Sequence, residues 1–515
     1  MVHKKIAIAL VLLSVNYVAS AFFWVNHRKG HDLLSLAGRT RRLDVVTAAE
    51  EQEAKTDALP SKYGPFYMDM PLDHFAKNKS VTFQNRYWIN ADYYKKDGPI
   101  ILANAGEAAV DDAAYTLTNT TMIQLAQKLN GIFIYMEHRF YGSSGPAATN
   151  FDYAANVISK LNTDQALADM AYILKNVKFS GLDVPAVPKT KAIVYGCSYS
   201  GNLAAWMKEQ YPELVYAAVA SSAPVQAQFN FYQYFDPIIR YGPTQCISAI
   251  EHVITYIDKI LFGSSSKAVK ELKELFGVPE LYDDDFASYL TTAIATYWQY
   301  GVELGDNRFD QVICNKVFNG TSVEDNVKSF AVFNKNYVEK NTCDGYSSIS
   351  ACLGSHNATD VQEQLASSPS TAAWTWQTCT EYGYFQVAAP KNNPTIVSRK
   401  LGIEVFERMC QLFFTKVGIP KKPNTAKVNK KYKGWNAKLD RIVWIDGEYD
   451  SWRELSVHSP QVKRNFSKNK QTLSIIIPEA THCVNWAGVN SKTPQYLKDI
   501  QDQQYKTLKR WLDQA

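Results

Sequence analysis

The segment AIVYGCSYSGNLAAW (192–206) joins an apolar strand to an alanine-rich helix through a turn of a few residues. A strand that leads so abruptly into a helix forms a sharp turn, and the turn accepts only small residues close to its tip. Gly196 meets this limit, and Ser200 is small enough to meet it where glycine would be easiest. The spacing therefore favours Ser198 as the residue at the tip.

Short apolar strands of the same kind recur along the chain and alternate with helical patterns. We expect strands at 99–104, 131–142, 191–196, 215–225, 441–447 and 472–480. Helices are expected at 121–130 and at 163–177, with Thr163 as the N-cap. This alternation predicts a parallel sheet covered by helices on both faces, which is an α/β fold.

After about residue 226 the alternation of short apolar strands with helices stops. Helical patterns at 267–277 and 283–301 are followed by cysteine-bearing loops, and strands resume only after a basic linker at 418–434. We interpret residues 63–229 and 431–515 as two parts of one α/β domain. Residues 230–430 are then a mostly helical cap inserted into it.

The N-terminus has the features of an export signal. Lys4 and Lys5 precede an apolar stretch that ends in Ala19-Ser20-Ala21, which predicts a signal peptide over residues 1–21. An uncleaved anchor is the alternative, although the stretch is short for a membrane span. Residues 22–62 are a propeptide cut after the Arg39–Arg42 run, or a solvated basic linker.

The net charge of +5 is concentrated in this leader. Seven of the 55 basic residues and one of the 50 acidic residues lie in 1–42, which leaves 48 basic and 49 acidic residues beyond it. The remaining chain is close to neutral, so we expect no nucleic-acid partner and no binding to an anionic membrane.

Eight cysteines in an exported chain predict disulfides, and no CxxC pair predicts a metal site. Cys197 is the exception, because its position beside the turn favours a buried, inert thiol. Glycosylation sequons begin at Asn78, Asn119, Asn319, Asn357 and Asn465.

Ser198 needs a base and an acid to become a nucleophile. In the α/β-hydrolase arrangement both follow the serine along the chain, the acid first, each after a strand. Asp450 follows the strand at 441–447 and His482 follows the strand at 472–480. The competitors are Asp446, at the end of its strand, and His458, which lies eight residues after Asp450 with no strand between them.

The backbone N–H of Tyr199 is expected to stabilise the oxyanion of such a reaction. A second donor is expected in the loop 104–109, where Gly106 or a neighbour presents its N–H. His138 is expected to support the carboxyl edge of the sheet.

Several segments together resemble the S28 serine peptidases. They are LDHF (72–75), TFQNRYW (82–88), AGE (105–107), EHRFYG (137–142), DQALADMA (164–171), GCSYSGNLAAW (196–206), AVASSAPV (218–225) and WQTCTEYGYFQ (376–386). The last of these segments and the THC around His482 are most similar to the thymus-specific protease branch. Cys197 and Ser200 depart from the family's usual G-G-S-Y-G-G, and Asn485 stands where an acid often follows the histidine.

The resemblance implies an α/β-hydrolase with a helical cap and hydrolysis of peptides after proline. It places the family's nucleophile, acid and base on Ser198, Asp450 and His482. It implies that Glu107 handles a peptide terminus and that Trp452 lines a proline pocket, with a plain core tryptophan as the alternative. It pairs Cys379 with Cys410 in the cap. Two further pairs, Cys246 with Cys314 and Cys343 with Cys352, are working guesses.

These expectations describe a secreted or lysosomal serine exopeptidase that uses no cofactor or metal. Its partners are proline-containing peptides, and a homodimer is a candidate assembly. Carboxypeptidase and dipeptidyl peptidase activity both stay open. The alternatives are an esterase or lipase on the same fold, and a non-catalytic binding protein.

Overall fold

The computed structural model describes residues 59–147, 151–301, 308–341, 343, 346–464, 466 and 471–515. The predicted signal peptide, the Arg39–Arg42 run, most of the predicted propeptide and the Asn465 sequon lie outside the described residues.

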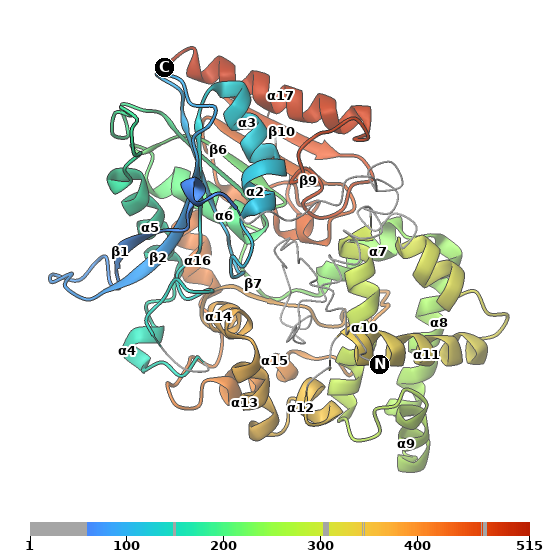
Figure 1. Ribbon diagram of the computed structural model, residues 1–515. Coiled ribbons are helices and arrows are strands. Elements are labelled where there is room, and N and C mark those ends of the chain that lie inside the picture. The colour runs from blue at the N-terminus through green and yellow to red at the C-terminus, as the bar shows by residue number, and fades with distance from the viewer. Residues whose placement is uncertain are drawn as a thin grey trace, which may run out of the picture.

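A twisted sheet of eight strands forms the centre of the molecule (Figure 1). Its strands are β1 Phe66–Pro71, β2 Thr82–Asn90, β3 Ile100–Asn104, β4 Ile132–Met136, β5 Ala192–Cys197, β6 Val215–Ser221, β9 Ile442–Gly447 and β10 Thr472–Ile477. Their order is β1-β2-β4-β3-β5-β6-β9-β10, and all pairs from β4 to β10 are parallel. The expected α/β-hydrolase fold is therefore confirmed, with β5 inside the sheet.

Helices cover both faces of this sheet, as the alternating pattern predicts (Figure 1). One face packs on α2 Ala114–Asn119, α3 Thr121–Leu129 and α17 Gln495–Leu512, and the other on α5 Thr163–Asn176 and α6 Tyr199–Gln210. Successive residues of β3 divide between the two cores: Ile101 joins Met122 and Leu508, whereas Leu102 joins Met170 and Leu203. A continuous apolar strand is needed because both of its faces are buried.

The first two strands are antiparallel and were not expected. β1 pairs with β2 and β2 pairs with β4 in antiparallel register, so the sheet is mixed rather than purely parallel. β1 lies at the sheet edge and alternates exposed with half-buried residues along its first half. An edge strand with one solvated face carries a period-two pattern instead of an apolar run, which is a weaker sequence signal.

The chain between β6 and β9 forms the helical insertion, in the lower and right parts of Figure 1. Its helices are α7 Asp236–Tyr241, α8 Thr244–Leu261, α9 Ser266–Leu275, α10 Asp283–Gln299, α11 Val323–Asn341, α12 Ile349–Leu353, α13 Ala358–Ser367, α14 Pro369–Gln377, α15 Ile403–Phe413 and α16 Thr425–Tyr432. Two short strands, β7 Gln228–Asn230 and β8 Gly383–Phe385, pair in parallel within the insertion. The insertion and one face of the sheet share a single apolar core.

Two helix starts differ from the sequence prediction by a few residues. The N-cap of α5 is Asn162, whose side chain accepts the Gln165 N–H, and not Thr163. Helix α6 begins at Tyr199, whereas the sequence pattern predicts a helix over Asn202–Glu209. Local pattern fixes such ends only to within a few residues.

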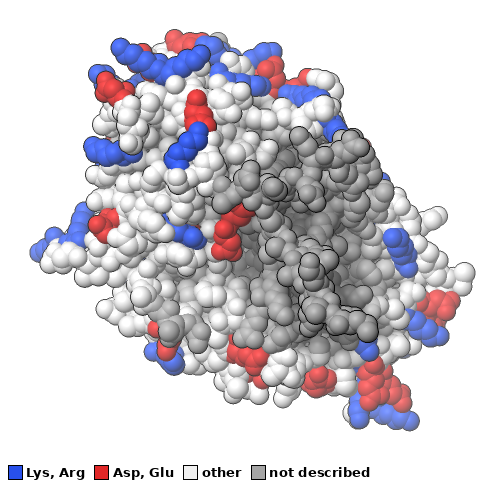
Figure 2. Space-filling model, in the orientation of Figure 1, with Lys and Arg blue, Asp and Glu red and all other residues white. Residues whose placement is uncertain are grey.

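Charged side chains of both signs are interspersed on the face in Figure 2. Among the described helices, none is long and apolar enough to cross a bilayer.

Candidate active site

The turn between β5 and α6 has the geometry of a nucleophile elbow. Ser198 has φ 61° and ψ −131°, in the left-handed half of backbone space, and its N–H donates to the Ser221 carbonyl at 2.9 Å. A Cβ on Gly196 would lie 2.0 Å from the Ser200 carbonyl oxygen, so only glycine fits there. Strain of this kind is held at functional sites by the surrounding structure.

Ser200 stands at a position where the S28 peptidases that this sequence resembles usually have a glycine. It lies in the first turn of α6, and its Oγ donates to the backbone carbonyl of Asn104 at 2.6 Å. This bond ties the elbow helix to the end of β3. Ser200 is therefore a structural residue whose hydroxyl is already used.

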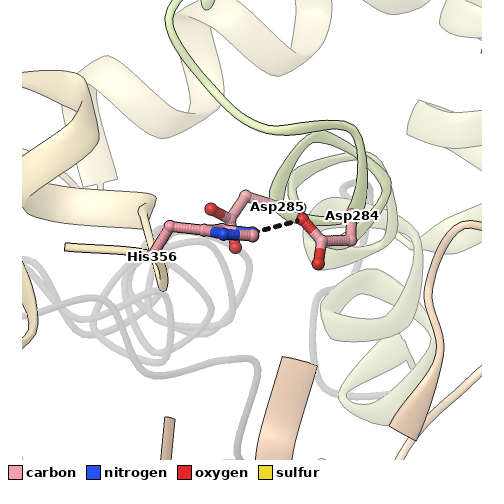
Figure 3. A group of neighbouring side chains, drawn as sticks. All are labelled: Asp284, Asp285 and His356. Carbon is pink, nitrogen blue, oxygen red and sulfur yellow. Dashed lines mark hydrogen bonds and ion pairs between the residues drawn. The ribbon is translucent and has the colours of Figure 1, made fainter. Parts of the chain in front are cut away.

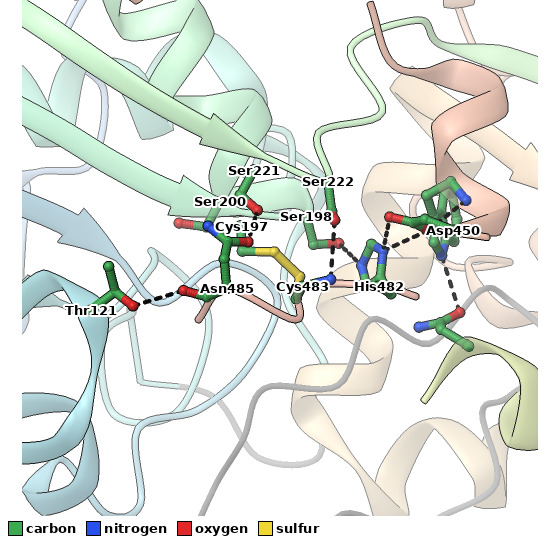
Figure 4. The surroundings of a disulfide bond; sticks show 12 residues. Thr121, Cys197, Ser198, Ser200, Ser221, Ser222, Asp450, His482, Cys483 and Asn485 are labelled. Carbon is green, nitrogen blue, oxygen red and sulfur yellow. Dashed lines mark hydrogen bonds and ion pairs between the residues drawn. A yellow bond between two sulfur atoms is a disulfide. The ribbon is translucent and has the colours of Figure 1, made fainter. Parts of the chain in front are cut away.

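Ser198, His482 and Asp450 form a hydrogen-bonded line (Figure 4). The Nε2 of His482 lies 2.9 Å from the Ser198 Oγ, and its Nδ1 lies 2.9 Å from both carboxylate oxygens of Asp450. The three residues are 2, 1 and 0% exposed. A neutral imidazole that donates from Nδ1 to the carboxylate has Nε2 free to accept the serine proton.

The insertion also helps to place this line. The N–H of His482 donates to the backbone carbonyl of Gln299, the last residue of α10, at 3.2 Å. Asp450 caps the short helix Ser451–Leu455, and its carboxylate accepts the Trp452 N–H at 2.8 Å. Asp450 and His482 are therefore held from both the sheet and the insertion.

Asp446 and His458, the alternatives to Asp450 and His482 in the sequence, form a second Ser–His–Asp line with Ser474. The Nδ1 of His458 is 2.6 Å from Asp446 Oδ2, and its Nε2 is 2.7 Å from Ser474 Oγ. Ser474 lies within β10, in regular strand rather than at a sharp turn before a helix. In the described residues, no helix begins directly after this strand to supply an oxyanion donor, since α17 starts only at Gln495. We assign this line a structural role between β9 and β10.

The two segments predicted to supply oxyanion donors are the start of α6 and the loop after β3. Tyr199 is the first residue of α6, where a helix leaves its N–H groups without an intrahelical partner. The Gly106 N–H, however, donates to the Asn104 side-chain oxygen at 2.8 Å. The Gly106 N–H thus already has a partner, and the roles of the Tyr199 N–H and of a neighbour of Gly106 as oxyanion donors stay predictions.

Cys197 is not the inert thiol that we expected. It is bonded to Cys483, the residue after His482 (Figure 4). The prediction is wrong because the strand neighbours of Cys197 say nothing about a loop 286 positions away. The other disulfides are Cys246–Cys314, Cys343–Cys352 and Cys379–Cys410, which are the predicted pairs.

The carboxyl group of Glu107 is buried beside the elbow. It is 7% exposed, and its Oε1 accepts no hydrogen bond from the described residues. Burial raises the pKa of Glu107 to about 8. Glu107 lies close enough to Tyr141, Tyr199 and Tyr384 for its charge to act on theirs. A buried carboxyl group with one oxygen left without a hydrogen bond, close to the elbow, is a candidate for binding a substrate group.

The ring of Trp452 lies in an aromatic cluster beside the base. Its centroid is 5.5 Å from those of Phe231 and Tyr384 and 6.3 Å from that of His482. Its Nε1 donates to Gln299 Oε1 at 3.1 Å. The side chain is fully buried, so its contact with a substrate stays a prediction.

His138 supports the elbow rather than the chemistry. It is buried, and its Nε2 lies 3.1 Å from the Tyr199 hydroxyl. The same hydroxyl accepts a hydrogen bond from Gln377 Nε2 at 2.7 Å. Burial lowers the pKa of His138 to about 4, so the ring is neutral above that pH.

The predicted glycosylation sites that the structure describes are all at the surface. They are Asn78, Asn119, Asn319 and Asn357.

Asp284, Asp285 and His356 form a cluster of the kind that can hold a metal ion (Figure 3). Each carboxylate already has partners: Asp284 accepts from Arg408 at 2.6 Å, and Asp285 accepts the Ser355 N–H at 3.0 Å. The arginine supplies the compensating charge. We therefore interpret the cluster as an ion-pair network that joins α10 to α15.

Known proteins match nearly the whole chain. The family described as serine carboxypeptidase S28 matches residues 70–503. The chain belongs to this family. It is therefore a serine-type peptidase, and its substrates are peptides.

Three relatives illustrate the range of the family. A protein of Arthroderma benhamiae named "Probable extracellular serine carboxypeptidase" is 31% identical, over 89% of this chain and 69% of that protein. The lysosomal Pro-X carboxypeptidase of Bos taurus is 26% identical over 88% of both chains. The thymus-specific serine protease of Homo sapiens is 24% identical, over 94% of this chain and 95% of that protein.

Proposed function

We propose that this peptidase is a secreted or lysosomal exopeptidase that cleaves after proline, with Ser198 as nucleophile, His482 as base and Asp450 as the acid that orients it. The observation that carries the catalytic assignment is the 2.9 Å contact between His482 Nε2 and Ser198 Oγ at a nucleophile elbow. The line Asp446–His458–Ser474 lacks that elbow.

The first half of the reaction acylates Ser198. His482 Nε2 takes the hydroxyl proton as Oγ attacks the carbonyl carbon, and Asp450 stabilises the imidazolium through Nδ1–H. The Tyr199 N–H at the start of α6 donates to the oxyanion. The imidazolium then gives its proton to the leaving amine, and the C–N bond breaks.

The second half returns the enzyme to its starting state. A water molecule gives a proton to His482 Nε2 and attacks the acyl carbon. The Ser198 Oγ leaves, takes the proton back, and releases the acid product. All protons pass through one imidazole nitrogen, so the scheme needs no other titrating group.

The preference for proline is supported by the aromatic cluster and by one relative. A proline ring packs well on aromatic faces, and Trp452 with Phe231 and Tyr384 lies beside His482. The Bos taurus relative is named for Pro-X cleavage. The proposed location rests on the extracellular and lysosomal names of relatives and on the export signal at 1–21.

The protonation state of Glu107 distinguishes carboxypeptidase activity from dipeptidyl peptidase activity. With a pKa of about 8, it is neutral in mildly acidic solution and donates a hydrogen bond to a substrate carboxylate. An ionised Glu107 instead pairs with a substrate ammonium group. Carboxypeptidase activity thus requires the neutral carboxyl, and dipeptidyl peptidase activity the charged one.

The catalytic assignment is tested with a fluorophosphonate probe and matched serine variants. We expect Ser198→Ala to abolish labelling, and Ser474→Ala to leave it intact. Labelling that survives Ser198→Ala would overturn the assignment. Absence of labelling and of turnover in the wild type would favour a binding protein.

The substrate class is tested with peptides that carry or lack proline, beside p-nitrophenyl esters. We expect cleavage after proline and much slower turnover of peptides without it. Turnover of esters alone would favour the esterase or lipase alternative.

The cleaved end is tested by identifying the products of one proline-containing peptide by mass. Blocking its C-terminus stops a carboxypeptidase, and blocking its N-terminus stops a dipeptidyl peptidase. Glu107→Gln keeps a neutral donor and cannot ionise. We expect it to preserve carboxypeptidase turnover and to raise the KM of dipeptidyl cleavage.

A further inference from the structure

The loop that carries His482 is joined to two central strands by one disulfide and three hydrogen bonds, one of them from Asn485 Nδ2 to the Tyr195 hydroxyl at 3.1 Å (Figure 4). The disulfide links Cys483 to Cys197 at the end of β5, with 5.9 Å between the Cα atoms. The Cys483 N–H donates to Ser222 Oγ at 3.0 Å. The Asn485 side-chain oxygen accepts from Ser221 Oγ at 2.5 Å. The loop is therefore fixed at two successive strand ends.

The disulfide connects the neighbours of the two reacting residues. Cys197 precedes Ser198 and Cys483 follows His482, so four residues and one sulfur–sulfur bond form a closed ring with the 2.9 Å contact between nucleophile and base. Without the disulfide, the covalent path between Ser198 and His482 runs through the whole insertion. The ring limits how far the imidazole can move from the serine.

Three residues around this ring have backbone angles that glycine adopts most easily. Ser198 has φ 61°, Ser222 has φ 45° and Cys483 has φ 57°. Such conformations persist only where the surrounding contacts determine them strongly. The disulfide and the bond from Cys483 to Ser222 are contacts of this kind, so their loss lets Cys483 relax and carry His482 with it.

We propose that the Cys197–Cys483 disulfide is a positioning crosslink that holds His482 against Ser198, so that catalysis depends on its oxidised state. This proposal rests on the proposed function of both residues. A small dithiol opens the bond by exchange: two thiols become one disulfide, and Cys197 and Cys483 each gain an electron and a proton. Cys483 is only partly buried, whereas Cys197 is buried.

The test compares two disulfide deletions in the full chain. In C197S/C483S we expect kcat to fall about 100-fold, because an ångström of misplacement costs that much. KM should stay within about threefold, since the binding groups are untouched. The control C343S/C352S removes a disulfide of the insertion that closes a short loop, and should keep the wild-type kcat. A kcat in C197S/C483S equal to that of the control would overturn the proposal.

Reduction of the folded wild type keeps the proposal testable if C197S/C483S does not fold. Opened disulfides are trapped by alkylation at each dithiothreitol concentration and identified by mass. Loss of kcat should follow alkylation of Cys197 and Cys483 and be reversed by reoxidation. Full activity with both residues alkylated would overturn the proposal, as would a loss that follows another disulfide.

Hydrogen exchange separates this proposal from the proposed function. Opening the disulfide should speed amide exchange in residues 480–488, whether or not the protein turns over peptides. Unchanged exchange there would overturn the crosslink and leave the catalytic assignment standing. An active wild type whose activity survives Ser198→Ala would overturn the catalytic assignment alone.

Discussion

At the scale of single residues, the site is decided by which side chains already have partners. Ser200 lies two residues from Ser198, but its hydroxyl donates to Asn104. His458 is held between Asp446 and Ser474. The residues of the proposed triad instead meet at the turn between β5 and α6, where Ser198 stands directly before the N-terminus of the helix. Residue type alone does not distinguish these serines, whereas the elements that carry them do.

Asp446 near the end of β9 and Asp450 just after that strand offer a matched pair of variants. Asp450→Asn should lower kcat about 10⁴-fold, because the amide favours the wrong imidazole tautomer. Asp446→Asn removes a charge of similar burial four residues away, and its amide oxygen can still accept from His458 Nδ1. It should leave kcat of the folded enzyme within about threefold. Steady-state kinetics on one peptide measures both. Equal losses would show that the charge of the region, and not the line to His482, controls the rate.

At the scale of elements, the sequence predicts the strands whose two faces are both buried. Strands β3, β5 and β9 are apolar on both faces, so their runs are visible without a partner. The order of serine, acid and base then follows from which element each one ends. β1 was missed because an edge strand shows no such run. The start of α6 was missed because Tyr199 and Ser200 are held by tertiary contacts rather than by an apolar pattern.

The Cys197–Cys483 bond has one signal in the sequence, which is the number of cysteines. Once six cysteines of an exported chain are paired within the insertion, the remaining two have only each other. Cysteine parity therefore favours this disulfide, but it says nothing about its place beside two reacting residues. That placement depends on strand order, which brings the loop after β10 across to the end of β5.

The elbow predicts a large difference between two glycines. Gly196→Ala sets a Cβ 2.0 Å from the Ser200 carbonyl oxygen, and this backbone contact cannot yield without displacing α6. The free energy of unfolding should fall by about 3 kcal/mol or more, and probe labelling of Ser198 should be lost. Denaturant unfolding and labelling measure the two effects.

Gly181→Ala is the control for this prediction. Gly181 has φ +74° but nothing within 4 Å of an added Cβ, so only backbone strain of about 1 kcal/mol is expected. Labelling should be kept. Equal stability of the two variants, with labelling intact in both, would contradict the steric account of the elbow.

At the scale of the whole molecule, buried carboxyl groups set the dependence of stability on pH. Burial raises the pKa of Glu107 to about 8, of Glu381 to about 7 and of Asp236 to about 6. These groups bind protons more tightly in the folded state than in the unfolded state. Their contribution to stability is complete below the ordinary carboxyl pKa and is lost as pH rises through these values. His138 acts in the opposite sense, because burial lowers its pKa to about 4.

Ion-paired carboxylates limit stability on the acidic side. Hydrogen bonding to Lys160 holds the pKa of Asp73 far below its usual range. The partners Arg139 and Lys273 outweigh burial and lower the pKa values of Asp169 and Asp283. Stability from these three groups is present above the ordinary aspartate pKa and is lost as pH falls below it.

Together these groups predict that the protein is most stable in mildly acidic solution. The three raised carboxyl pKa values outweigh the one lowered histidine pKa, so the melting temperature should fall from pH 5 towards pH 8. It should also fall below about pH 4, where the ion-paired aspartates become protonated. Thermal unfolding across this range measures it. Glu107→Gln removes the group with the highest of these raised values and should flatten the fall between pH 6 and pH 8. A melting temperature that rises steadily to pH 8 would contradict the account, because the buried carboxyls would then have to be ionised without cost to the fold.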